Sequence, residues 1–488
     1  MMVTVEDWTA VRDALQQYLA TAQDHSGPVI QQPPIAELAS SLAVDEWILR
    51  GELRGSALAQ FLRTYLGAST RLHHAGYMAH QVAIPEPLAA VGALVEAITN
   101  NVGNLYEMGP AATTIEFALL NWMLRKVGWK AMPAPGVASH GEDARIIGGG
   151  TFTNGGSLAN LTALFAARSR VSPHAWRAGI PHHLVVIVPE SAHYSIARAV
   201  DLLGLGQDSM VAPPTTPDGR IRPDALGPLI QELWCQGREI LAVVATAGAT
   251  GSGLFDDLEA IGSVCQETAT WLHVDGAHGA SALLSDVHRH LLAGVVRADS
   301  LTWDAHKMLR TPALCTALLV RDHRVLDAAF HQDASYLFHD KDQPGVDFLH
   351  RTLECTRSGV GLRLFLALAA HGERGIAGYI DRQVALAKEA GAYLASTPGI
   401  TLAVEPEFNI VCFRVEGNDG LQLEIRRRLL VHGDHYVTTT RLRGQRWLRL
   451  ALMSPATEID DIRRLVIECL EHRSAILTDE TVALVDVR

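Results

Sequence analysis

The chain has 488 residues, of which 48% are hydrophobic and 6% aromatic, and its formal net charge is -12. This length predicts two or three structural units rather than one small core. The negative charge argues against a nucleic-acid-binding protein. Because no run of 18 apolar residues occurs, we expect no membrane span.

The start of the chain and its cysteines favour a cytoplasmic protein. Glu6 and Asp7 stand where a signal peptide would carry basic charge. The six cysteines are widely spaced and form no metal-binding or redox motif, which fits a reducing compartment. The histidine pairs 73–74 and 182–183 are adjacent and lack the i, i+4 spacing of a helical metal site, so we expect no bound metal.

Residues 1–75 are predicted to form a helical N-terminal arm. Apolar residues recur every three or four positions in 13–20 and in 57–66. A segment rich in glycine and proline, 27–34, separates the two. Arms of this kind often pack on a partner subunit.

Between about residues 85 and 330, helical patterns alternate with short apolar strands. Helices are expected at 88–100, 113–127 and 159–170, and strands at 184–188, 240–246, 271–275, 301–303 and 314–320. This alternation predicts an α/β fold whose mostly parallel sheet is covered on both faces. Functional residues of such sheets collect at the carboxyl ends of the strands, where Asp275 and Lys307 stand.

After residue 330 the pattern of polar and apolar residues changes twice. Residues 331–346 are polar and have no apolar period, which is typical of a lid loop. The large domain is expected to span 76–374 and to include this lid. From residue 375 to 488 the pattern indicates a small α+β C-terminal domain. Its expected elements are a helix at 381–394, strands at 408–415, 436–440 and 447–452, and a closing helix from about 457.

Three features, in chain order, are the parts needed to hold pyridoxal phosphate. A glycine-rich turn at 153–160 opens a helix, whose free N–H groups attract anions. Asp275 ends one strand and can pair with a pyridinium nitrogen, and Lys307 follows another and can form an imine with an aldehyde. Taken singly, these could be a tight turn, a helix cap and a solvated lysine. A dinucleotide-binding enzyme is disfavoured because no G-x-G-x-x-G follows a first strand.

Further motifs make the chain similar to a known family. They are Gly-Pro-Ala-Ala-Thr-Thr-Ile-Glu (109–116), Ser-Ala-His (191–193), His-Val-Asp (273–275), His-Lys (306–307) and the segment 448–457. From about residue 70 onward the chain resembles the pyridoxal-phosphate-dependent group II amino-acid decarboxylases, which include glutamate, aromatic amino-acid, cysteine-sulfinate and diaminobutyrate decarboxylases. The resemblance implies the aspartate-aminotransferase-like fold (pyridoxal phosphate fold type I). It also implies a homodimer with its active site at the subunit interface.

The resemblance also implies roles for individual residues around the cofactor. Lys307 would carry the covalent link and Asp275 would pair with the ring nitrogen. The other contacts would be His193 and Ala277 on the two faces of the ring, Gly156, Ser157 and His306 near the phosphate, and Thr246 near the ring substituents.

For the substrate, the resemblance points to an arginine, two pocket residues and a tyrosine. Arg449 would hold the α-carboxylate, although it could also be an exposed strand arginine. Tyr77 and His80 align with a segment that lines the substrate pocket. Tyr336, 29 residues after Lys307 in the predicted lid, would donate the proton that completes decarboxylation, because relatives that make aldehydes tend to have phenylalanine there.

The expected activity is α-decarboxylation of an L-amino acid to the amine and carbon dioxide. Oxidative deamination to an aldehyde, transamination and β-elimination stay open as alternatives, and a catalytically silent scaffold is a remote one. The chain also departs from the common family pattern: Gly276 and His278 replace an alanine and an aromatic residue, and Asp304-Ala305 replaces Asn-Pro. These departures leave the substrate undetermined.

Overall fold

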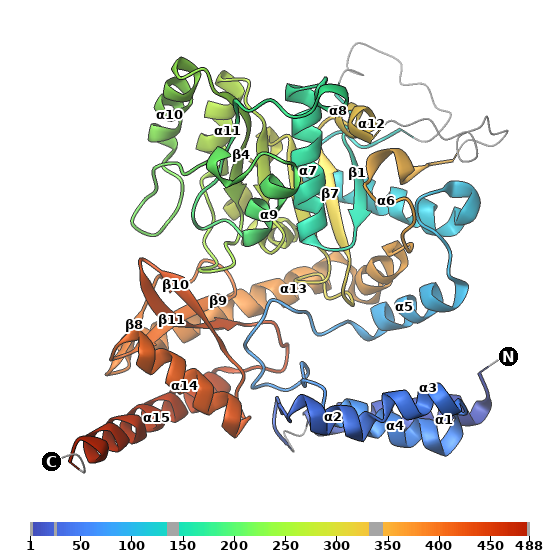
Figure 1. The fold of residues 1–488 in the computed structure, drawn as a ribbon, viewed down its shortest axis with the longest axis vertical. Helices are drawn as coiled ribbons and strands as arrows, with labels where there is room; N and C mark the ends of the chain where they lie inside the picture. Colours follow the sequence, from blue (N-terminus) through green and yellow to red (C-terminus); the bar gives the residue numbers. More distant parts are fainter. Residues whose placement is uncertain (1–2, 24–26, 134–145, 331–344, 486–488) are drawn as a thin grey trace. The chain divides into compact units, whose positions relative to one another are not determined.

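The computed structural model describes residues 3–23, 27–133, 146–330 and 345–485 (Figure 1). The chain divides into two compact units. The smaller unit contains Met1–Ile84, Leu386–Glu405 and Asn409–Arg488, and the larger one contains Pro85–Ala385 and Pro406–Phe408. Among the helices described, none is both long and apolar enough to cross a membrane.

The larger unit is built on a seven-stranded sheet with the order β1-β7-β6-β5-β4-β2-β3. Strands β2 to β6 pair in parallel, whereas β7 runs antiparallel to both β6 and β1. The α/β class with a mostly parallel sheet is therefore confirmed. The strands are β1 (Gly149–Thr153), β2 (Leu184–Ile187), β3 (Met210–Val211), β4 (Glu239–Thr246), β5 (Leu272–Asp275), β6 (Ser300–Asp304) and β7 (Thr316–Val320).

Helices cover this sheet, and Figure 1 shows α7 in front of it, next to β7. Apolar side chains of α7, α9 and α12 share one core with β2, β4 and β7. The helices are α5 (Pro87–Thr99), α6 (Pro110–Val127), α7 (Gly156–Val171), α8 (Ala175–Ala178), α9 (Tyr194–Leu202), α10 (Pro223–Cys235), α11 (Leu258–Glu267) and α12 (Arg324–Phe330). Helix α6 illustrates how local sequence sets the ends of a helix. Pro110 is its first residue, and Gly128 ends it in the left-handed conformation.

The smaller unit combines N-terminal helices with a four-stranded antiparallel sheet of order β10-β11-β9-β8. Two helices, α14 and α15, contribute to its apolar core with β9 and β11. Its elements are α1 (Val5–Gln23), α2 (Ile35–Leu42), α3 (Val44–Arg50), α4 (Gly55–Gly67), β8 (Ile400–Leu402), β9 (Ile410–Val415), α14 (Asp419–His432), β10 (Thr438–Leu442), β11 (Gln445–Ala451) and α15 (Ile459–Val485).

Some elements differ from the sequence prediction for local reasons. The pattern does not indicate β1, because Gly-Gly-Thr-Phe-Thr has no apolar run, and β3 is only two residues long. The predicted helix at 381–394 is part of a longer one, α13 (Gly361–Ser396), which is kinked at Gly372. Residues 331–344 of the predicted lid lie outside the described part of the chain. The domain borders at residues 75 and 375 stay predictions.

Candidate active site

A cavity of about 320 Å³ lies in the larger unit where β4, β5 and β6 end. The last residue of each strand lines it, namely Thr246, Asp275 and Asp304. Parallel strands bring their carboxyl ends to one edge of the sheet, so these side chains converge there. The same cavity is lined by Lys307, His306, His193, Ala277, Gly156 and Ser157.

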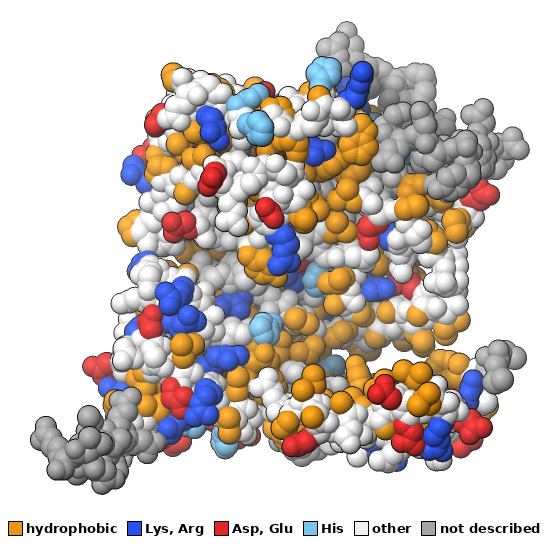
Figure 2. Space-filling view, in the orientation of Figure 1, with side chains coloured by type: hydrophobic (Ala, Val, Ile, Leu, Met, Phe, Trp, Pro, Cys, Tyr) orange, Lys and Arg blue, Asp and Glu red, His pale blue; other side chains and the backbone are white. Residues whose placement is uncertain are grey.

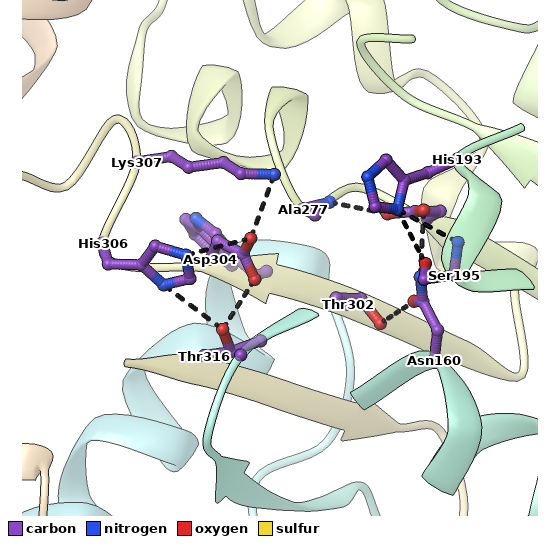
Figure 3. Close-up of polar contacts among 12 residues, drawn as sticks. Asn160, His193, Ser195, Ala277, Thr302, Asp304, His306, Lys307 and Thr316 are labelled. Carbon is purple, nitrogen blue, oxygen red and sulfur yellow. Dashed lines mark hydrogen bonds and ion pairs between the residues drawn. The ribbon is translucent and has the colours of Figure 1, made fainter. Parts of the chain in front are cut away.

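Lys307 forms an ion pair with Asp304 inside this cavity (Figure 3). Its Nζ lies 3.0 Å from Asp304 Oδ2, and the His306 ring lies 3.6 Å from the same oxygen. Thr316 Oγ1 donates to the other oxygen at 2.6 Å. Burial by itself would raise the pKa of Asp304, but Lys307, His306 and Thr316 together lower it. The cavity therefore holds a second carboxylate, which the sequence flagged only as a departure from the family pattern.

Asp275 is held by two donors at the end of β5. Asn160 Nδ2 donates to its Oδ2 at 3.0 Å, and the Ala277 N–H donates to its Oδ1 at 3.2 Å. A buried carboxylate at this position is suited to pair with the protonated nitrogen of a heteroaromatic ring.

His193 is fixed by its place at the start of α9. It is the N-cap residue, and its Nδ1 accepts from the Ser195 N–H at 3.3 Å, while Ser195 Oγ lies 2.9 Å away. Burial and the nearby Lys307 lower the pKa of His193, although Asp275 acts in the opposite direction. The ring is consequently neutral near neutral pH and can lie against an aromatic cofactor.

The glycine turn before α7 fits a phosphate group. Gly155 has a φ of 102°, a conformation that favours glycine, and α7 begins at Gly156. A Cβ added at Gly156 would lie 3.0 Å from Asp304, so the backbone and this carboxylate approach closely. Free N–H groups at the start of a helix bind phosphate. The buried Thr246 hydroxyl has no hydrogen-bond partner among the described residues, which leaves it available to a ring substituent. These residues fit pyridoxal phosphate.

The three predicted substrate residues lie together in the smaller unit. Arg449 on β11 is buried, and its Nη1 donates to the Ala79 carbonyl at 3.1 Å. The ring of His80 lies 3.0 Å from the Tyr436 hydroxyl, and Tyr77 packs edge-on against Tyr436. Partial desolvation and Arg449 lower the pKa of His80. Each unit thus contains one group of predicted site residues, and Tyr336 lies outside the described residues.

The structure also adds residues that the sequence did not assign. Asn160 and Ser195 line the cavity, and His278 is buried beside Phe408 with their rings 5.5 Å apart. Asn160 stands inside the glycine motif and Ser195 two positions after His193, but neither position by itself signals a contact. The described residues contain no group of three or more His, Cys, Asp or Glu side chains placed to bind a metal.

Comparison with known proteins shows the family to which the chain belongs. Residues 63–416 match the family described as the pyridoxal-dependent decarboxylase conserved domain. The chain therefore belongs to the pyridoxal-phosphate-dependent amino-acid decarboxylases, and its cofactor is pyridoxal phosphate.

Individual members of the family cover most of the chain. The cysteine sulfinic acid decarboxylase of Mus musculus is 32% identical over 412 residues, which are 81% of this chain and 80% of that protein. The L-2,4-diaminobutyrate decarboxylase of Acinetobacter baumannii is 27% identical over 444 residues, 86% and 84% of the two chains. A crystal structure of Oryza sativa TDC with PLP and tryptamine superposes with a TM-score of 0.84 at 25% identity and covers 98% of this chain and 99% of that one.

Proposed function

We propose that the protein removes the α-carboxylate of an L-amino acid and releases the amine and carbon dioxide. The observation that carries the proposal is the convergence of Lys307, Asp275 and His193 on one cavity at the strand ends. These are the groups needed to attach pyridoxal phosphate, to keep its ring nitrogen protonated and to hold its ring flat.

Pyridoxal phosphate, when bound, supplies a conjugated ring that accepts the electron pair of the bond from Cα to the carboxylate. Lys307 would hold the cofactor and take it back when the amine leaves. Asp275 would keep the proton on the ring nitrogen, because an ionised carboxylate favours a cation beside it. His193 and Ala277 would fix the plane of the ring. The phosphate would be bound by Gly156, Ser157 and His306, and a ring substituent by Thr246.

Substrate orientation decides which bond breaks. Arg449 would hold the carboxylate out of the ring plane, so that the bond to be broken overlaps the conjugated system. Tyr77 and His80, beside it in the smaller unit, would contact the substrate side chain. Tyr336 would then deliver the proton to Cα. A tyrosine in this role separates amine formation from oxidation to an aldehyde.

The active form would be a homodimer in the cytoplasm. Helix α5 supports the dimer, because four apolar residues one turn apart form an exposed row on it. Leu88, Val91, Val95 and Ile98 are 46%, 49%, 41% and 66% exposed. An apolar row of this kind is typical of a surface that another chain covers.

Product analysis tests the proposal. The protein loaded with cofactor is given acidic, basic, aromatic and sulfur-containing L-amino acids, and amine and carbon dioxide are quantified. We expect equal amounts of both from one substrate class, none from Lys307→Ala, and suppressed amine formation in Tyr336→Phe. An aldehyde with ammonia and carbon dioxide would contradict amine formation, and a keto acid without carbon dioxide would contradict decarboxylation. A protein that holds the cofactor and turns over none of the panel would point to the silent scaffold.

A further inference from the structure

A polar layer lies beneath Asp275 in the otherwise apolar core. Strands β5 and β6 pair in parallel with His273 opposite Ser300 and Asp275 opposite Thr302. Residues two apart on a strand project to the same face, so these four side chains share one face of the sheet. Asn160 of α7 contacts three of them, namely Asp275, His273 and Thr302. Figure 3 shows its contact with Thr302. All five residues are at most 6% exposed.

Hydrogen bonding fixes the orientation of the Asn160 amide. An ionised Asp275 can only accept, so the group 3.0 Å from its Oδ2 is the Asn160 NH2. The amide oxygen therefore faces His273, whose Nε2 lies 3.1 Å away and must carry the hydrogen. Burial lowers the pKa of His273 to about 4, so its ring is neutral and has only that one N–H.

The hydrogen bonds on the far side of His273 require the same placement of its hydrogen on Nε2. His273 Nδ1, left without a hydrogen, accepts from Ser300 Oγ at 2.9 Å. Ser300 Oγ in turn accepts from Trp271 Nε1 at 3.0 Å, and an indole nitrogen can only donate. Every hydrogen from Trp271 through Ser300 and His273 to Asn160 thus points toward Asp275. Trp271 can only donate and an ionised Asp275 can only accept, so the two ends of this series of hydrogen bonds allow the Asn160 amide one orientation.

Asn160 uses its full hydrogen-bonding capacity in that orientation. Its oxygen accepts from His273 and from Thr302 Oγ1, the latter at 2.7 Å. Its second amide hydrogen goes to Ser195 Oγ at 3.0 Å. Ser195 then donates to His193 Nδ1 at 2.9 Å. One buried amide therefore binds Asp275 directly and His193 through Ser195.

We propose that Asn160 is the positioning residue for the cofactor ring, with one amide hydrogen holding Asp275 and the other, through Ser195, holding His193. The proposal rests on the proposed function for the roles of those two residues. A side chain that only filled space would not need both of its donors aimed at the two ring contacts. The buried layer from Trp271 to Asn160 serves to keep that amide from turning.

The sharpest variant is Asn160→Asp, which keeps the shape and the acceptor oxygen but replaces both donors. The measurements are the dissociation constant of pyridoxal phosphate and the visible circular dichroism of the bound cofactor, which reports how the ring is held. At about pH 8 we expect about tenfold weaker binding and a reduced band. At about pH 6 the defect should shrink, because a protonated carboxylic acid regains one donor.

Two further variants are matched to this one. Thr302→Val removes a partner of the acceptor side only, so binding should stay within about threefold and the band should persist. Ser195→Ala leaves the bond from Asn160 to Asp275 intact and should reduce the band through His193 alone, while lowering the thermal midpoint of the cofactor-free protein no more than Thr302→Val does. Ser195→Ala also provides the test if Asn160→Asp does not fold.

Clear results would overturn the inference. They are an Asn160→Asp protein with binding and band equal to wild type, equal losses in Thr302→Val and Asn160→Asp, or an unchanged band in Ser195→Ala. None of these readings uses turnover. A wild-type protein that holds the cofactor with a strong band but makes no amine would contradict the proposed function and leave this inference standing.

Discussion

At the scale of single residues, the pairing of Lys307 with Asp304 is the most consequential contact in the cavity. Asp304 is almost fully buried and the lysine amine lies 3.0 Å away. Burying either charge without its partner would cost free energy, so the charged form of each group is stabilised by the other. The pair keeps the lysine side chain in a defined place before the cofactor arrives.

Asp304→Asn should therefore destabilise the cofactor-free protein. The amide can still accept from Thr316, but it leaves the lysine without its counter-ion. We expect a loss of about 3 kcal/mol in the free energy of unfolding, measured by urea titration. Thr316→Val is the control and should cost only about 1 kcal/mol, since it removes one hydrogen bond. Equal losses in the two variants would mean that the charge on Asp304 contributes nothing.

At the scale of elements, the carboxylate of Glu468 on α15 forms hydrogen bonds with the end of α14 and with the loop after it. Glu468 accepts from His432 Nδ1 at 2.7 Å and from His435 Nδ1 at 2.6 Å. His472 lies 3.4 Å from the same carboxylate, and Asp434 lies 3.8 Å from His432. The loop also carries Tyr436, the partner of His80. The conformation of a predicted substrate contact thus depends on a titratable cluster.

The stability supplied by this cluster should depend on pH. The hydrogen bond to Glu468 raises the pKa of His432 above 6.5, so its contribution is complete below pH 6.5 and is lost as the pH rises through the folded value. The pKa of Glu468 is lowered below 4.5, because His435 and His432 outweigh burial, so its contribution is lost only in stronger acid. Glu468→Gln should cost about 2 kcal/mol of unfolding free energy between pH 4.5 and 6.5, and less at about pH 8. A cost that stayed constant over this range, in urea titrations, would contradict the assignment.

At the scale of the whole molecule, the sequence predicts the alternating elements well and the buried polar layer poorly. The apolar runs of β2, β4 and β5 are visible without a structure, as are the strand-end positions of Asp275 and Lys307. The contacts of Asn160 are not, because its partners Ser195, Asp275 and Thr302 are 35, 115 and 142 residues away. Only the register of β5 against β6 and the placement of α7 and α9 bring them together.

Assembly belongs to the same scale, and α5 gives it a test. A double substitution, Val91→Glu with Val95→Glu, places two charges in the exposed apolar row. We expect a monomer by light scattering coupled to size-exclusion chromatography, with loss of amine formation, because a charge cannot be buried unpaired in an interface. Val431→Glu, at a side chain of α14 that is 76% exposed, is the control and should leave the mass unchanged. A fully active monomer would contradict the homodimer.

The reversal of β7 within the sheet has a consequence for how the two halves of the cavity come together during folding. Antiparallel pairing sets Thr316 opposite Asp304 only 12 residues along the chain, so the segment carrying Lys307 is the loop of a hairpin. Such a loop closes through local contacts, at a small cost in chain entropy. The amide contact of Asp275 spans 115 residues and must wait for α7 to dock. We therefore expect the lysine side to form early in folding and the ring-nitrogen side to form later.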